Sequence, residues 1–112
     1  MAEAFVLDRA SILERLGDDE DIYEMMVEMY LEDVGNNCAA LSAAFDSGDA
    51  SVLQREAHTV KGLLATFSDA VGAADAHDLE QMARQGEIAG LGDAVSGLQQ
   101  RLREVAAALS AG

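Results

Sequence analysis

The sequence contains no proline, a single cysteine and few aromatic residues. Its 112 residues include no tryptophan, two tyrosines and three phenylalanines. Without proline, no position forbids the backbone hydrogen bonds of long helices. The apolar residues are mostly alanine, leucine, valine and methionine, which suit helix packing better than a β-sandwich. The composition therefore predicts an all-helical protein, and the length predicts one domain over residues 1–112.

Basic residues are also scarce. Seven lysines and arginines stand against 21 acidic residues, which gives a net charge of −14. A chain of this charge lacks the basic surface that a nucleic-acid backbone requires, and anionic membranes would repel it. The charge favours a protein partner, although it serves general solubility equally well.

The single cysteine, Cys38, excludes a disulfide within the chain, so nothing points to an oxidising compartment. A lone cysteine among apolar neighbours is typically a small buried hydrophobe. The N-terminus has no basic segment followed by a long apolar run, and no stretch approaches about 20 apolar residues. We therefore expect a cytoplasmic protein without a signal peptide or a membrane span.

Glycines and acidic residues divide the chain into five predicted helices. A short helix covers roughly Leu7 to Leu16, and a long one follows it as far as Gly48. The third begins at Asp49 or Ser51, the fourth runs from about Asp69 to Gln85, and the fifth carries the apolar residues from Val95 to Leu109. The prediction is an all-α fold: an antiparallel up-down four-helix bundle with an additional short N-terminal helix.

Apolar residues recur in steps of three and four along the helices, which marks the face that each one buries. In the second helix these residues are Ile22, Met25, Met26, Met29, Tyr30, Val34, Cys38, Leu41 and Phe45. The third carries Leu53, Ala57, Val60, Leu64 and Phe67, and the fifth carries Val95, Leu98, Leu102, Val105 and Leu109. The methionine cluster is accordingly expected in the core rather than in a binding patch.

Three residues of the third helix do not fit a purely structural pattern. His58 lies about 100° from the core residue Ala57, on the flank of the buried face. Helical side chains lean toward the N-terminus, so Lys61 brings an ammonium near the ring and Gly62 leaves the ring open. An accessible imidazole beside a positive charge suits phosphoryl transfer. The alternative is a surface histidine, a solvated lysine and a close-packing glycine, and the residues alone do not decide.

The segment "AHTVKG" resembles the His-x-x-Lys-Gly signature of histidine phosphotransfer (HPt) domains, the carriers of bacterial multistep phosphorelays. The likeness continues through "ILERLGDDEDIYEMMVEMYLED", "AAFDSGDASVLQREAHTVKG" and "LEQMAR", and so covers nearly the whole chain. It implies a helical bundle with an exposed phosphoaccepting histidine midway along one helix.

The resemblance also implies roles for individual residues. His58 matches the phosphoacceptor, Lys61 the lysine that stabilises the phosphoryl group, and Gly62 the glycine that clears the approach. Glu80 falls where the family often has glutamine or glutamate facing the histidine. In this position it would accept a hydrogen bond from the proton on Nδ1. Arg84 matches a basic position near the site in some members. An ion pair between Glu80 and Arg84 is the structural alternative.

The function that the resemblance implies is a phosphorelay carrier. His58 would take a phosphoryl group from a receiver-domain aspartate and pass it to another receiver. The domain has no nucleotide-binding motif, so we expect no autonomous enzyme, no cofactor or metal of its own, and Mg²⁺ supplied by the receiver. Gln54, Leu63 and Ala65 are candidates for the docking surface of a monomer. The alternative is a non-catalytic helical adaptor that binds a signalling partner without phosphotransfer.

The sequence departs from the family pattern after the histidine helix. Family members commonly have an asparagine two residues before a glycine that ends this helix, and Thr66 and Ser68 stand in those places. Ser68 must end the helix without the easy left-handed conformation of glycine, which puts the loop geometry in question. The second histidine, His77, lacks a following Lys-Gly and is expected to be an ordinary surface or boundary residue.

Overall fold

A computed structural model describes residues 3–111, and it is helical throughout its regular parts. Its elements are α1 (Arg9–Arg15), α2 (Glu20–Ser47), α3 (Ala50–Thr66), α4 (Ala70–Arg84) and α5 (Gly92–Ala111). No strand occurs within these residues, so the predicted all-α class is confirmed. The first helix is shorter than the span from Leu7 to Leu16 that the sequence predicted.

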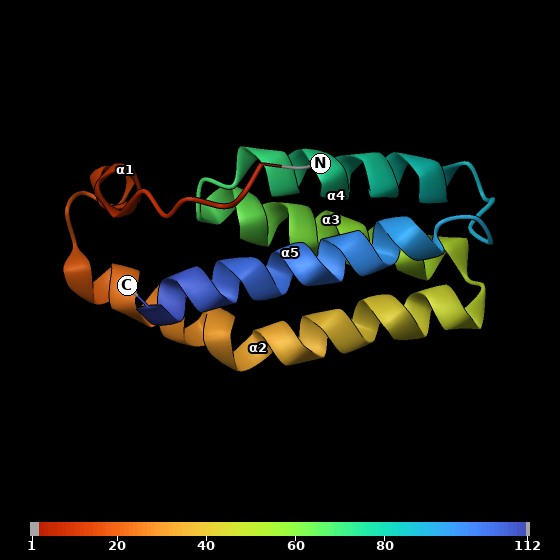
Figure 1. The fold of residues 1–112 in the computed structure, drawn as a ribbon, viewed down its shortest axis with the longest axis horizontal. Helices are drawn as coiled ribbons and strands as arrows, with labels where there is room; N and C mark the ends of the chain where they lie inside the picture. Colours follow the sequence, from red (N-terminus) through yellow and green to blue (C-terminus); the bar gives the residue numbers. More distant parts are fainter. Residues whose placement is uncertain (1–2, 112) are drawn as a thin grey trace.

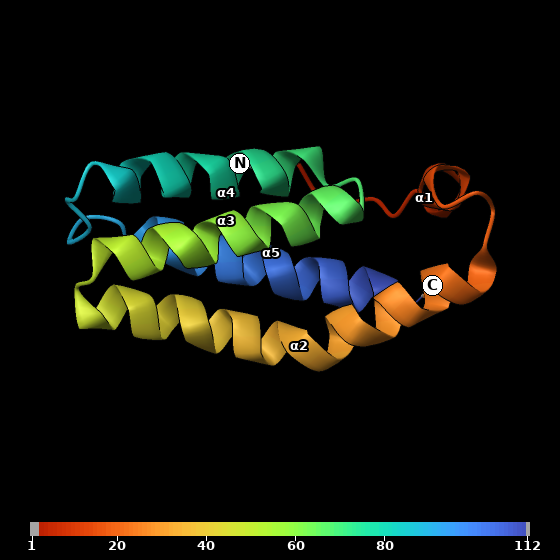
Figure 2. The ribbon, with the colours of Figure 1, turned by 180° about the vertical axis from the view of Figure 1, so that it is seen from behind.

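The four longer helices lie side by side, and α1 lies at one end of them (Figures 1 and 2). The chain runs in alternate directions along α2, α3, α4 and α5 (Figure 1). Helix α3 packs most extensively against α4, and α2 contacts both α3 and α5. Within residues 3–111, no helix has the length and apolar character needed to cross a membrane.

Four helices begin with the same chemistry, an aspartate whose side chain accepts a hydrogen bond from a backbone N–H of the first turn. These N-caps are Asp8, Asp19, Asp49 and Asp69. A carboxylate at this position satisfies an N–H group that has no partner inside the helix, and it complements the positive end of the helix dipole. Of the two predicted starts of α3, the structure therefore selects Asp49 over Ser51.

The core follows the predicted faces of α3 and α5. The five apolar residues predicted to form the buried face of the third helix are all buried, among them Phe67 at the C-cap of α3, and so are the five predicted for α5. They meet Cys38 and Leu41 of α2 and Leu79 of α4 in one cluster. Cys38 is therefore the small buried hydrophobe that the sequence predicted.

The predicted core face of α2 is wrong over its first turns. Ile22, Met25 and Met29 are 42%, 57% and 55% exposed. The predicted Tyr30 is buried, and so is Tyr23, which was not part of the predicted face. Tyr30 donates its hydroxyl to the carbonyl of Leu102, 2.8 Å away. The two tyrosines are seven residues apart and so share one face, and their large rings set which side of the helix packs inward.

The turn between α3 and α4 contains a left-handed residue that is not glycine. Ser68 has φ of 62°, a conformation that costs most L-residues about 1 kcal/mol or more. The Arg15 guanidinium donates to the Ser68 hydroxyl and to the Thr66 carbonyl, both at 2.8 Å. The helix thus ends in the left-handed conformation usual for glycine, braced here by an arginine from α1.

A buried ion pair fixes the start of α4 against α5. Arg101 donates to both carboxylate oxygens of Asp69, at 2.8 and 2.7 Å, and both side chains are almost fully buried. Asp69 also caps Gly72 N–H at 3.0 Å. A Cβ atom at Gly72 would lie 2.1 Å from Asp69 Oδ2 and 2.9 Å from Leu64 Cδ1. Gly72 therefore allows α4 to begin in close contact with the ion pair and with α3.

Candidate functional site

His58 projects from the middle of α3 into solvent. It stands one residue after the core residue Ala57, and its side chain is 65% exposed. The ring therefore lies on the flank of the buried face, as the helical spacing predicted. A reacting partner can reach it without any rearrangement of the core.

One carboxylate, that of Glu80 on α4, contacts both His58 and Lys61. Its Oε2 lies 3.0 Å from His58 Nδ1, and its Oε1 accepts a hydrogen bond of 2.8 Å from Lys61 Nζ. The Glu80 side chain is only 7% exposed, so these contacts replace much of its hydration. The contact that the sequence predicted between Glu80 and His58 is present, and the additional contact with Lys61 was not foreseen.

The contact with Glu80 selects one tautomer of the neutral His58 ring. The bond from Lys61, with a smaller effect from His58, lowers the pKa of Glu80, so the carboxylate is ionised at neutral pH. An ionised carboxylate only accepts hydrogen bonds, and His58 Nδ1 must therefore carry the proton that it donates. In a neutral imidazole, the lone pair then resides on Nε2, on the other side of the ring.

Gly62 faces open space. A Cβ atom built at this position would meet no atom within 4 Å, so core packing does not explain the glycine. Its φ is not in the left-handed region either, and a glycine inside a helix is unfavourable by about 1 kcal/mol relative to alanine. The glycine leaves free space one turn beyond His58.

A shallow hollow of about 250 Å³ adjoins the histidine. It is lined by Ser51, Gln54, Arg55, His58 and Glu80. Gln54 was a predicted partner contact, and it lies in this hollow. Arg55 was not among the predicted site residues, although its position three residues before His58 puts both on neighbouring parts of one helix face.

The predicted contact residues Leu63 and Ala65 lie on different sides of α3. Ala65 is exposed, whereas Leu63 is half-buried and borders a hollow of about 150 Å³ between α2 and α3. Met26 and Met29 of α2 border the same hollow. Together with the exposed Met25, they form an apolar area that we call the methionine patch: Met25, Met26, Met29 and Leu63.

Arg84 and His77 do not contact the cluster of His58, Lys61 and Glu80. Arg84 is exposed in the last turn of α4 and makes no ion pair within residues 3–111. The alternative ion pair between Arg84 and Glu80 is not formed, since Glu80 contacts His58 and Lys61 instead. His77 is exposed on α4. Within the described chain, no group of three or more His, Cys, Asp or Glu side chains is arranged to hold a metal ion.

One comparison with known proteins identifies a family, and a second shows the same fold. The family model described as "Hpt domain" matches residues 25–108. The crystal structure of histidine-containing phosphotransfer protein B (HptB) from Pseudomonas aeruginosa PAO1 is similar in fold. Its TM-score is 0.84 at 24% sequence identity, and the match covers 97% of this chain and 95% of that chain. A search of curated protein sequences found no match.

Proposed function

Because this chain belongs to the Hpt domain family, we propose that it is a phosphorelay carrier whose phosphoacceptor is His58. The observation that carries the proposal is the contact of Glu80 with His58 Nδ1 at 3.0 Å, on a ring that is 65% exposed. In the neutral ring, this contact places the proton on Nδ1 and leaves the lone pair on the second nitrogen, Nε2. The alternating course of α2 to α5 supports the antiparallel four-helix arrangement that presents this ring.

The transfer step uses the Nε2 lone pair of His58. That lone pair attacks the phosphorus of an aspartyl phosphate on a receiver domain and forms a P–N bond. The bond between phosphorus and the aspartate oxygen breaks, and its electron pair stays on the receiver carboxylate. The Nδ1 proton remains hydrogen-bonded to Glu80, which offsets the positive charge that develops on the ring. The reverse sequence of bonds delivers the phosphoryl group to a second receiver.

Lys61 acts on the phosphoryl oxygens in this proposal. Its ammonium is 2.8 Å from Glu80 Oε1 and partly exposed, one turn from His58. When the phosphoryl group is bonded to Nε2, its three negatively charged oxygens can accept hydrogen bonds from the Lys61 ammonium in addition to the bond that Glu80 accepts. Mg²⁺ is expected from the acidic pocket of the receiver, and this domain then acts as a carrier rather than as a self-sufficient enzyme.

The receiver is proposed to dock across the exposed face of α3. At about 100° per residue, Leu63 lies about 140° around the helix from His58, with Gly62 between them. A partner that covers this arc would contact the His58 hollow on one side and the methionine patch on the other. Exposed methionines suit such a surface because their flexible side chains adapt to more than one partner. Monomeric state and cytoplasmic location remain predictions from the sequence.

Phosphoryl transfer from a phosphorylated receiver tests the proposal directly. We expect the wild-type protein to gain an acid-labile, alkali-stable label, which is the behaviour of a phosphohistidine. The variant His58→Gln should gain none and should keep its helical circular dichroism. The matched control His77→Gln, at the other exposed histidine, should be labelled like the wild type.

Two results would contradict the proposal. A label that persists in His58→Gln and disappears in His77→Gln would move the acceptor to His77. No label from any phosphorylated receiver, in a protein that still binds receivers, would favour the adaptor alternative.

A further inference from the structure

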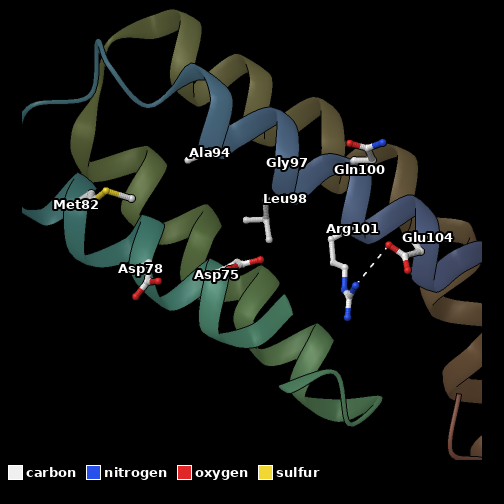
Figure 3. Close-up of a pocket in the computed structure, with 9 residues that line it drawn as sticks. All are labelled: Asp75, Asp78, Met82, Ala94, Gly97, Leu98, Gln100, Arg101 and Glu104. Atoms are coloured by element: carbon white, nitrogen blue, oxygen red, sulfur yellow. Dashed lines mark hydrogen bonds and ion pairs between the residues drawn. The ribbon is translucent and has the colours of Figure 1, made fainter. Parts of the chain in front are cut away.

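A second surface feature lies away from His58, in a groove between α4 and α5 (Figure 3). Its volume is about 410 Å³, which falls within the range of about 300–1,000 Å³ that ligand pockets occupy. Leu98 projects between the two helices at its base, with Met82 of α4 and Ala94 of α5 farther along. The groove therefore has an apolar base.

The groove is open because α5 carries a glycine where it faces α4. A Cβ atom at Gly97 would meet no atom within 4 Å, and its φ is not left-handed. Neither close packing nor backbone conformation therefore requires glycine at this position, which lies inside a helix where glycine is unfavourable. Any larger side chain at Gly97 would occupy the groove.

The walls of the groove are acidic. Asp75 and Asp78 on α4 are exposed, and neither forms an ion pair within residues 3–111. Glu104 stands on the α5 wall, where its Oε1 accepts a hydrogen bond of 3.4 Å from Arg101 Nη1. Arg101, the basic residue of the lining, also donates to both oxygens of Asp69. The groove thus combines an apolar base with a rim that carries two carboxylates, those of Asp75 and Asp78, which are unpaired within the described chain.

We propose that this groove binds a basic peptide segment of a protein partner, with an aliphatic side chain over Leu98 and Gly97 and lysines or arginines on the acidic rim. Charge complementarity selects this occupant. A second copy of the chain is disfavoured, since it carries 21 acidic and only seven basic residues. The acidic rim equally disfavours a nucleic acid.

The groove and the His58 site lie on opposite sides of α4. Around the helix, Asp75 lies about 140° and Met82 about 160° from Glu80, and the buried residues Ala76 and Leu79 separate the two flanks. A segment in the groove would therefore leave His58 accessible. The inference goes beyond the proposed carrier function and does not depend on it.

The test titrates ¹⁵N-labelled protein with an acetylated and amidated peptide, Lys-Lys-Leu-Leu-Lys-Lys, followed by amide chemical shifts. We expect the largest shift changes at residues of the groove, among them Asp75, Gly97 and Leu98. A peptide with serine in place of leucine separates groove binding from attraction to a negatively charged protein, because it should bind several-fold more weakly. A peptide with glutamate in place of lysine should not bind.

Three variants sharpen the assignment. Gly97→Leu should weaken binding by at least about tenfold while it stabilises the helix, since it fills the groove without a clash. Asp75→Asn combined with Asp78→Asn should weaken binding by about fivefold. The matched control neutralises two exposed carboxylates elsewhere, Glu32→Gln with Asp46→Asn, and should change the Kd by less than about twofold.

Each contrary result overturns the inference. Unchanged binding in Gly97→Leu would exclude the groove as the binding site. Equal binding of the serine peptide, or shift changes spread over the acidic surface, would reduce the effect to general charge attraction. Groove shifts that depend on protein concentration without peptide would identify a second copy as the occupant. Labelling of His58 in Gly97→Leu tests the carrier function separately and should be normal.

Discussion

Replacing Gly62 with leucine should move stability and phosphoryl transfer in opposite directions. Nothing lies within 4 Å of a Cβ atom at this position, so the folded protein accepts the new side chain without a clash. Leucine is the better helix former by about 0.8 kcal/mol. We therefore expect Gly62→Leu to unfold about 3–4 °C higher than the wild type.

The same side chain should obstruct the reaction. A side chain at position 62 leans toward the N-terminus of α3 and so covers the space beside His58. An approaching receiver would have to displace it before phosphorus reaches Nε2. We expect transfer to slow by at least about tenfold, which corresponds to about 1.4 kcal/mol of activation free energy.

The assay measures single-turnover transfer from a phosphorylated receiver by rapid quenching, alongside a thermal melt of each variant. Gly97→Leu is the matched control, because it makes the same substitution at a second open position inside a helix. It should gain similar stability and transfer at the wild-type rate. A normal rate in Gly62→Leu would refute the reasoning that the glycine clears the approach to His58.

Three further substitutions test the contacts that hold the site together. The hydrogen bond from Lys61 lowers the pKa of Glu80 in the folded protein. The ionised carboxylate therefore stabilises the fold at pH values above the ordinary glutamate pKa of about 4.3, and this contribution is lost as the pH falls through the lower pKa of the folded state. Urea unfolding of Glu80→Gln should lack this loss at acid pH, and an unchanged pH profile would contradict the assignment. Ser68→Gly should raise the free energy of unfolding by about 1 kcal/mol, since glycine adopts a φ of 62° without strain. A lower melting temperature would show that the lost hydrogen bond from Arg15 to the Ser68 hydroxyl matters more. Gly72→Ala should lower the free energy of unfolding by about 3 kcal/mol, because the new Cβ would lie 2.1 Å from an Asp69 oxygen that Arg101 holds in place. An unchanged melting temperature would exclude this close contact.

Helical periodicity was sufficient to predict the faces of α3 and α5. Each of these helices is covered along its length, so a step of three or four residues corresponds to one buried side. The exposure of His58 followed from the same spacing, one residue after Ala57. The resemblance to a known family added the match of Glu80, and the contact with His58 is present in the structure.

The first turns of α2 show where periodicity is not enough. Ile22, Met25 and Met29 have helical spacing and are still exposed. Tyr23, which was not on the predicted face, shares one side of the helix with the predicted Tyr30, and burial of these two larger rings together with the hydrogen bond from Tyr30 to Leu102 turns that side inward. Helix α2 is also the longest, with 28 residues. A long helix can extend past the partners that would cover it, and its own sequence does not reveal where those partners end.

The link between Lys61 and Glu80 could not be predicted from helical spacing, because it depends on the register between two helices. Glu80 lies eleven residues after Asp69, or about 16 Å along α4, so its height against His58 depends on where α4 begins. That starting point is fixed by the pair of Asp69 and Arg101 and by the missing side chain of Gly72.

A small displacement of α4 would therefore act on the chemistry from a distance. One residue of slippage moves a helix by about 1.5 Å, which would lengthen the contact of 3.0 Å between Glu80 and His58 to between about 3.4 and about 4.5 Å, depending on its direction, and so weaken or break the hydrogen bond. The tautomer of neutral His58 that is protonated on Nδ1 would then be less favoured, and Nε2 would carry the lone pair in a smaller fraction of the molecules. We therefore expect the buried ion pair of Asp69 and Arg101 to affect the proposed transfer at His58 as well as the stability of the fold, although it lies at the far end of α4 and contacts neither His58 nor Glu80.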